Sequence, residues 1–278
     1  MITIKEALTK KEMKDYVMFS FELYKNNPYW IPPIIAEELE TFDKTKNPAL
    51  QTAEAHFYLA YKNGKIVGKV AAIINWEEVN LLEKRKVRFG WFDAIDDIEV
   101  TKALLSKVEE LGKKHQMDHM EGPMGFSNLD KVGVLSEGFD EMGNMITWYS
   151  LPYYITHFEQ LGLVKEKEYQ ESIFSFSNID PTTFQKFSEL VKQRYNLKSL
   201  NFTKTKDIMP YVDKMFDLFN ETYSKLQSFV PINDIQKTYF KKKYISFINP
   251  EFIKFIMDKN DNMIAFAIVM PGFAQALK

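Results

Sequence analysis

The stretch that decides the fold is Phe57-Tyr-Leu-Ala-Tyr61, followed by Lys62-Asn-Gly-Lys65 and Ile66-Val-Gly-Lys-Val-Ala-Ala-Ile-Ile74. Two apolar runs separated by a short polar segment predict a β-hairpin. Asn63 and Gly64 supply the two positive φ angles that a type I′ turn needs, so the turn is placed at these two residues.

The segments around this hairpin alternate between strand and helix patterns. Thr9 and Glu12 have the spacing of a capping box and predict the start of a helix, after a short strand at 2–4. The other expected elements are a helix at 34–41, strands at 87–95, 118–121, 145–149 and 168–176, a helix from Ile98 to Leu111, a turn-rich loop at 122–128 and a helix at 152–162. This order predicts an α/β domain with a mixed sheet.

Composition narrows the class of protein. The chain has 278 residues, 36 Lys and Arg against 38 Asp and Glu, and no cysteine. This balance argues against broad nucleic-acid binding, and the lack of cysteine excludes disulfides, a thiolate nucleophile and cysteine-based zinc sites. The four histidines are scattered, His115 and His119 are expected to be surface residues, and no metal site is expected.

A soluble cytoplasmic protein is expected, with no membrane partner. Residues 1–8 lack the apolar core of a signal peptide, and no segment approaches the ~20 apolar residues of a membrane span.

The pattern starts again after residue 179. A helix is expected at 184–195, a strand at 197–202, helices at 207–226 and 234–247, and a second hairpin at 252–270. At a constant offset of 197, Lys62-Asn63 falls on Lys259-Asn260. We therefore predict a first domain at 1–178 and a partial second copy at 179–278 that stops after its third strand, as in a piece of a longer protein. Convergent hairpin chemistry is the alternative interpretation.

The order of elements, with the tight hairpin Tyr61-Lys-Asn-Gly-Lys-Ile-Val-Gly68, resembles the GNAT (acyl-CoA N-acyltransferase) fold. More specifically, the chain resembles a bacterial family of tandem GNAT-like proteins, over residues 1–175 by motif and over the remainder by element order. The motifs are Trp30-Ile-Pro-Pro33, Gly122-Pro123 with Phe126-Ser127, Gly138-Phe139 and Pro152-Tyr153-Tyr154.

The resemblance implies an N-acyltransferase that uses acetyl-CoA or another acyl-CoA as co-substrate and a small-molecule or peptide amine as acceptor. It implies a pantetheine arm between the fourth and fifth strands, and a diphosphate at the start of the helix after the fourth strand. The catalytic candidates are Asp93, Tyr153 and Tyr154. The cofactor-binding candidates are Ala94, Ile95, Thr101, Lys102, Ser127 and Asn128.

The segment expected to hold the diphosphate departs from the superfamily pattern. It reads Asp96-Asp-Ile-Glu-Val-Thr-Lys102, without glycine and with three carboxylates, which oppose an anion. Capping of the helix by these acids, with a box from Asp96 to Glu99, is favoured over a catalytic role. Lys102 offsets part of the repulsion or is simply solvated.

Each candidate also has a structural interpretation. Asp93 is either a cleft residue or a partly exposed strand residue, and one of Tyr153 and Tyr154 is expected to be core packing. Ser127 and Asn128 bind a ligand or form a turn. The aromatic residues Phe89, Trp91, Phe92 and Trp148 line an apolar pocket or, as we favour, pack in the core.

Three functions stay open from sequence alone. The first is acyl transfer to an amine, the second is a degenerate GNAT-like unit that only binds a ligand or acts as a scaffold, and the third is a tandem transferase with a non-CoA donor such as an aminoacyl-tRNA. The run Lys237-Thr-Tyr-Phe-Lys-Lys-Lys243 is the one basic cluster relevant to RNA, and a solvated helix face explains it better. The oligomeric state cannot be predicted.

Overall fold

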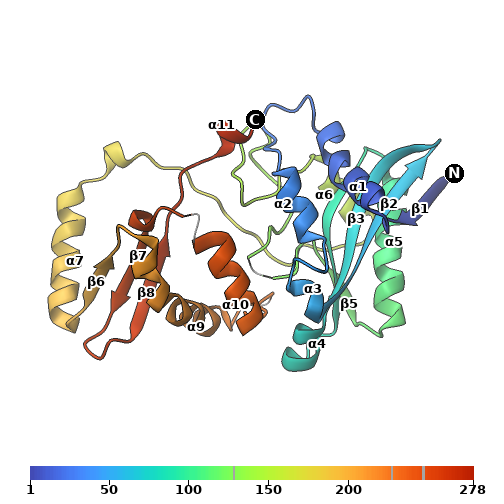
Figure 1. Cartoon of the computed structure of the whole chain (residues 1–278). Helices are drawn as coiled ribbons and strands as arrows, with labels where there is room; N and C mark the ends of the chain where they lie inside the picture. Colours follow the sequence, from blue (N-terminus) through green and yellow to red (C-terminus); the bar gives the residue numbers. More distant parts are fainter. Residues whose placement is uncertain (128, 227, 246–247) are drawn as a thin grey trace. The chain divides into compact units, whose positions relative to one another are not determined.

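A computed structural model describes residues 1–127, 129–226, 228–245 and 248–278. The chain divides into two compact units, each described here by itself (Figure 1). Unit 1 comprises Met1–Val164, Leu226–Val230 and Gly272–Lys278, and unit 2 comprises Lys165–Lys225 and Pro231–Pro271.

Unit 1 is built on a five-stranded mixed sheet in the order β1-β2-β3-β4-β5. The first three pairings are antiparallel, and β4 pairs with β5 in parallel. The strands are β1 (Ile2–Glu6), β2 (Ala53–Lys62), β3 (Lys65–Asn75), β4 (Lys86–Ala94) and β5 (His119–Glu121). The predicted mixed sheet is confirmed.

The hairpin between β2 and β3 forms as its sequence predicts. Lys62 pairs with Lys65, so that Asn63 and Gly64 alone make the turn. Their φ angles are 53° and 76°, the left-handed values that a type I′ turn requires.

Gly64→Ala tests the turn. A side chain at Gly64 meets nothing within 4 Å, so the cost comes from the backbone at positive φ and should be about 1–2 kcal/mol of unfolding free energy. All four tryptophans, at positions 30, 76, 91 and 148, belong to unit 1, so urea unfolding followed by tryptophan fluorescence reports this unit. Gly272→Ala, also without neighbours and without a positive φ, is the control, and equal midpoints for the two variants would contradict the turn assignment.

Helices cover both faces of this sheet, and alternate strand residues feed two cores (Figure 1). Val70 and Ala72 pack in one core with α5 and α6, while Ala71 and Ile73 pack in the other with α1. The helices are α1 (Lys10–Leu23), α2 (Ile35–Thr41), α3 (Ala49–Thr52), α4 (Trp76–Leu82), α5 (Ile98–Lys114) and α6 (Tyr153–Gln160). The predicted capping box at Thr9 and Glu12 is confirmed at the start of α1.

Two sequence predictions for this region are wrong. The segments 145–149 and 168–176 form no strand. All residues of 168–176 are exposed, and this segment pairs with no strand in the described part of the chain. Alternating apolar residues make a strand only where a sheet edge is available to pair with them. The short helix α4 was not predicted, because its seven residues lie between two strands and give little periodicity.

Unit 2 contains a three-stranded antiparallel sheet in the order β6-β7-β8. Its strands are β6 (Lys198–Asn201), β7 (Ile253–Met257) and β8 (Met263–Ile268). Its α-helices are α7 (Pro181–Tyr195), α8 (Thr205–Ile208), α9 (Val212–Tyr223) and α10 (Asp234–Phe240). Short helical segments are η1 (Phe176–Asn178), η2 (Met209–Tyr211), η3 (Lys241–Ile245) and η4 (Pro250–Phe252), and unit 1 adds α11 (Ala274–Leu277).

The second hairpin shares features with the first. At the offset of 197, Gly64 corresponds to Asp261, whose φ is 59°. The connection differs, because five residues separate Met257 from its partner Met263. Asp258 accepts hydrogen bonds from the backbone N–H groups of Asn260 and Asn262 and so holds this longer loop. A common origin of the two hairpins stays a prediction.

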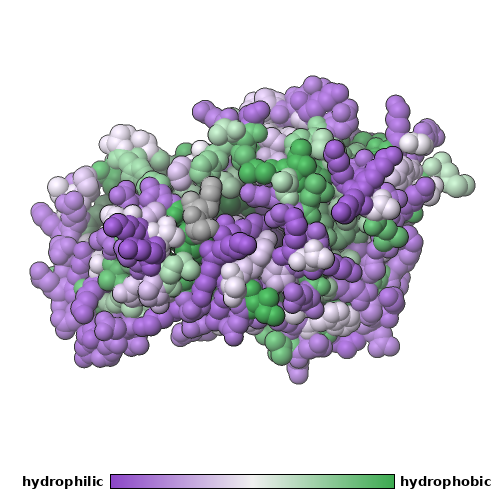
Figure 2. Space-filling model, in the orientation of Figure 1, coloured by the Kyte–Doolittle hydropathy of each residue, from purple (hydrophilic) through white to green (hydrophobic). Residues whose placement is uncertain are grey.

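Hydrophilic residues predominate on the face drawn in Figure 2. Among the described residues, no helix has the length and apolar character needed to cross a membrane.

Candidate active site

The candidate site lies in unit 1, where β4 and β5 stop pairing. Their parallel pairing involves only Lys86–Arg88 and His119–Glu121. Beyond it, the Met124 N–H donates to the Phe89 carbonyl at 2.7 Å. Gly90 permits this approach, because a Cβ there would lie 2.2 Å from the Met124 carbonyl oxygen.

A bulge in β4 shapes the next residues. Lys69 pairs with Asp93 but Ala71 pairs with Gly90, so β4 carries one extra residue at this point. Trp91 takes a φ of 44°, an unusual value for a bulky side chain and one associated with functional sites. As a consequence three successive residues, Trp91, Phe92 and Asp93, all line one cavity.

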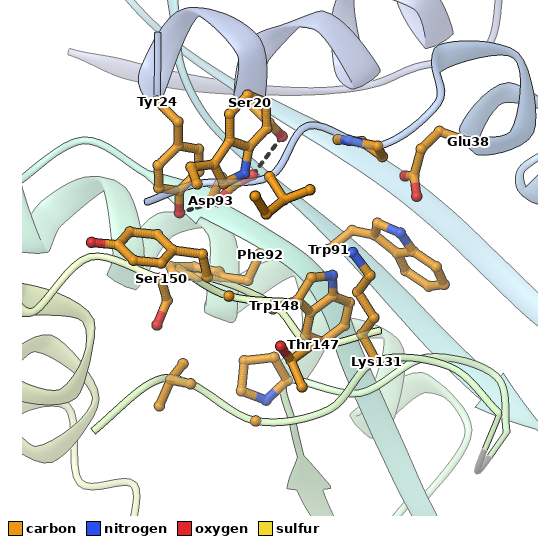
Figure 3. A pocket seen from close by; sticks show the side chains of 18 of the residues that line it. Ser20, Tyr24, Glu38, Trp91, Phe92, Asp93, Lys131, Thr147, Trp148 and Ser150 are labelled. Atoms are coloured by element: carbon orange, nitrogen blue, oxygen red, sulfur yellow. Dashed lines mark hydrogen bonds between the residues drawn. The ribbon is translucent and has the colours of Figure 1, made fainter. Parts of the chain in front are cut away.

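The cavity has aromatic walls and a polar base (Figure 3). Its walls come from α1, α2 and the loop before it, from β3 and β4, and from the 123–150 segment. Its lining includes Trp30, Ile31, Pro33, Val134, Trp148 and Tyr149 as apolar groups, and Ser20, Tyr24, Glu38, Lys69, Asp93 and Lys131 as polar groups. An apolar cavity with a few convergent polar groups is the usual form of a small-molecule site.

Asp93 is the best-connected polar residue of this base. Ser20 Oγ donates to Asp93 Oδ2 at 2.7 Å, and the Tyr24 hydroxyl donates to Oδ1 at 2.8 Å, as drawn in Figure 3. Lys69 Nζ lies 3.5 Å from Oδ2, and both residues are buried. The structure therefore places Asp93 in the cavity rather than at an exposed edge.

Sequence reasoning missed Ser20, Tyr24 and Lys69. Lys69 carries the clearest signal in the sequence, because it interrupts the apolar run 66–74. In the structure this lysine is only 3% exposed. A buried lysine requires compensation, which Asp93 and the ring of Tyr16, 4.9 Å from Nζ, provide.

The two tyrosines of α6 bind the end of β4. The Tyr154 hydroxyl accepts from the Ala94 N–H at 3.0 Å, and the Tyr153 hydroxyl donates to the Ala94 carbonyl at 2.7 Å. Tyr154 also lies 3.3 Å from Asp93 Oδ1. Burial, with the nearby Asp93 charge, raises the pKa of Tyr24 and Tyr154 well above the usual value, so both stay protonated at neutral pH.

Substituting the two tyrosines separates their structural roles. Tyr154→Phe leaves the buried Ala94 N–H without an acceptor and should cost about 1–3 kcal/mol of unfolding free energy. Tyr153→Phe should cost less, about 0.5–1.5 kcal/mol, because the Ala94 carbonyl keeps Tyr154 at 3.3 Å. Tryptophan-detected urea unfolding measures both, and a larger loss for Tyr153→Phe would contradict this assignment.

The acids at the start of α5 act in capping and pairing. Asp97, not Asp96, is the N-cap residue, and its side chain accepts from the Glu99 N–H at 3.1 Å. The predicted capping box from Asp96 to Glu99 is therefore wrong: the N-cap lies one residue later, and the third helical residue after it is Val100, which cannot complete a box. Asp97 also pairs with Lys62 at 2.7 Å, and the Lys62 hydrogen bond holds the pKa of Asp97 below its usual value.

Asp96 and Thr101 are joined through a residue that the sequence did not single out. His157 Nε2 lies 3.2 Å from Asp96 Oδ1, and its Nδ1 lies 2.9 Å from Thr101 Oγ1. Thr101, a cofactor-binding candidate, is fully buried, so its hydroxyl is committed to His157.

The remaining candidates lie apart from the Asp93 cluster. The Ile95 N–H donates to the Val67 carbonyl, and Lys102 is exposed on α5. Ser127 Oγ accepts from the Leu129 N–H and its own N–H donates to Asp130, which is a turn role. Asn128 lies outside the described residues.

The four aromatic residues singled out in the sequence do not all have the same role. Phe89 is a core residue with no exposed surface, as favoured from sequence. Trp91, Phe92 and Trp148 pack in the cores and also line the cavity. Among the described residues, no group of three or more histidine or acidic side chains is placed to hold a metal.

The chain resembles two curated bacterial proteins in sequence. It is 25% identical to Protein YghO of Escherichia coli (strain K12) over 279 residues, covering 99% of this chain and 69% of that protein. It is 23% identical to the Bacterial ceramide synthase of Caulobacter vibrioides over 251 residues, covering 89% of this chain and 64% of that protein. The chain thus spans about two thirds of the length of these relatives. No protein-family model matches it.

Among solved structures, the chain is similar to a tandem GNAT protein from the clavulanic acid biosynthesis pathway, determined without AcCoA. That similarity has a TM-score of 0.49 and 10% identity, and covers 98% of this chain and 76% of the other. The fold assignment rests on the strand order and pairing of unit 1. These are a mixed sheet with a tight β2–β3 hairpin, a parallel β4–β5 pair and a helix between those two strands. Unit 1 thus has a mixed α/β fold whose strands follow the order that the resemblance to the GNAT fold implies.

Proposed function

We propose that this protein is an N-acyltransferase that transfers an acyl group from acyl-CoA to a primary amine bound in the Asp93 cavity. The observation that carries the proposal is the buried Asp93 carboxylate, held by Ser20 and Tyr24 at the base of an aromatic-walled cavity. The name of the Caulobacter relative supports the reaction type, because a ceramide is a long-chain amino alcohol acylated on nitrogen.

Asp93 is the proposed general base. An amine in neutral water is an ammonium ion, and it must lose a proton before its nitrogen lone pair can attack an acyl carbon. The two hydroxyl donors and Lys69 fix the orientation of the carboxylate toward the cavity. Tyr153 and Tyr154 remain candidate proton donors in this proposal.

The residues at the start of α5 do not fit the diphosphate of CoA. Asp96, Asp97 and Glu99 put negative charge there, and Asp97 already caps the helix. The hydrogen-bonding groups of Ala94 are likewise taken by tyrosine hydroxyls. These contacts favour a second candidate function, in which unit 1 binds an amine without catalysing transfer.

A thiol-release assay separates the two candidates. The whole protein is incubated with acetyl-CoA or palmitoyl-CoA and a panel of primary amines, and free CoA thiol is detected with a chromogenic disulfide reagent. The chain has no cysteine, so it contributes no background signal. We expect release that requires both substrates, with the amide identified by mass. Release no faster than spontaneous hydrolysis for every pair would reject the acyl-CoA transferase.

A further inference from the structure

The cavity holds two charged side chains that do not neutralise each other by contact. Glu38 and Lys131 both line it. In the described part of the chain, neither residue has a partner of opposite charge within 4 Å. This contrasts with Lys69 and Asp93, which pair at 3.5 Å in the same cavity.

The four charges nevertheless form one electrostatic group. Glu38 is attracted by Lys69 and Lys131 and repelled by Asp130, while Lys131 is attracted by Glu38 and Asp93 and repelled by Lys69. In Figure 3, Glu38 and Lys131 lie on the Trp91 side of the cavity, away from Tyr24. Two positive and two negative side chains thus line the same cavity. Lys69 and Asp93 are in contact, whereas Glu38 and Lys131 are not.

Glu38 and Lys131 are both half-buried in the cavity and have lost part of their contact with water. Burial raises the pKa of Glu38 and lowers the pKa of Lys131, which means that both charged forms lack full solvation. A ligand with one charge of each sign compensates both residues at once, whereas a simple amine compensates Glu38 alone.

We propose that the cavity binds a zwitterionic headgroup, with its primary ammonium toward Glu38 and its anionic group toward Lys131. The anionic group is a carboxylate, sulfonate or phosphate. This inference rests on the proposed function, because it names the class of amine acceptor. The apolar walls, including Ile31, Trp148 and Val134, accommodate an attached hydrocarbon chain.

Calorimetric titration of the whole protein with small headgroup probes, in the absence of an acyl donor, tests the proposal. β-Alanine, taurine and O-phosphoethanolamine carry the three anionic groups, and ethanolamine carries only the ammonium. We expect the best zwitterion to bind about tenfold or more tightly than ethanolamine. The ranking of the three zwitterions identifies the anion.

Two variants assign the charges. Lys131→Met should weaken the zwitterions about tenfold and leave ethanolamine unchanged, while Glu38→Gln should weaken every ammonium probe. Lys113→Met removes a lysine that is 73% exposed on α5 and is the matched control. Equal binding of ethanolamine and all zwitterions, an equal effect of Lys131→Met on both classes, or no binding of any probe would overturn the proposal.

The assay for the proposed function gives an independent answer. Selective zwitterion binding without thiol release would reject acyl transfer and keep this inference. Acyl transfer to ethanolamine as fast as to the zwitterions would keep the function and reject this inference.

Discussion

Asp93→Asn should lower the rate of acyl transfer by at least about 10²-fold, because positioned acid–base groups contribute roughly that much or more. Asparagine keeps the size of the side chain and one acceptor oxygen, so one of Ser20 and Tyr24 can still donate to it while the hydroxyl of the other accepts from the amide NH2. It cannot take a proton from the bound ammonium. The effect should therefore fall on kcat, with a much smaller change in the KM for the amine.

Stability has to be separated from catalysis in this variant. Lys69 is 3% exposed, and in Asp93→Asn it loses the carboxylate 3.5 Å away. An unpaired buried charge costs about 3–5 kcal/mol, which is enough to unfold a marginal unit. The double variant Asp93→Asn/Lys69→Met removes both charges and should recover much of that loss.

The double variant makes the prediction decisive. We expect it to fold, as judged by its tryptophan-detected urea midpoint, and to remain as inactive as Asp93→Asn. Asp118→Asn, at a side chain that is 70% exposed, is the control and should behave as the unaltered protein does. A folded double variant that retains transfer within about threefold of the unaltered rate would remove Asp93 from the base role.

The parts of this site that sequence could predict are those set by local chemistry. Asn63 and Gly64 determine a turn within four residues, and Thr9 and Glu12 determine a helix start. Asp93 and Tyr154 are candidates from their motif positions, and their side chains lie within 3.3 Å of each other in the structure. Such features depend on short spacings or on the order of elements.

The partners of Asp93 could not be predicted because they come from distant elements. Ser20 and Tyr24 stand 73 and 69 residues before it, at the end of α1 and directly after it, and their spacing is that of an ordinary helix face. Only the position of α1 over the bulged part of β4 brings these hydroxyls to the carboxylate. The wrong strand at 168–176 has the same origin, since strand formation depends on a neighbouring edge that the local sequence does not reveal.

Glu78→Gln should destabilise unit 1 by about 3–5 kcal/mol. Glu78 is 1% exposed, and its two carboxylate oxygens contact Lys86 Nζ and Arg88 Nε, both at 2.9 Å. Lys86 also contacts Glu121 of β5 at 2.5 Å. Two cations and two carboxylates therefore balance in the buried base of β4, and the glutamine variant leaves one positive charge in excess.

This group of charges lies at the end of the β4–β5 pairing that is next to the cavity. Lys86, Arg88 and Glu121 lie where β4 and β5 still pair, immediately before the two strands diverge around the cavity. The charge group therefore holds together the end of the sheet from which Asp93 is positioned.

A matched pair of variants tests whether charge balance, rather than any single contact, accounts for the loss. Glu78→Gln/Lys86→Met restores the balance between Arg88 and Glu121 and should be less destabilised than Glu78→Gln alone. Glu110, whose side chain is 61% exposed, pairs with Lys107. Glu110→Gln breaks this pair and should cost no more than about 1 kcal/mol of unfolding free energy. Tryptophan-detected urea unfolding compares all three. If Glu78→Gln costs no more than Glu110→Gln, the buried group does not stabilise the β4–β5 junction, and the aromatic packing around it must hold the strands together.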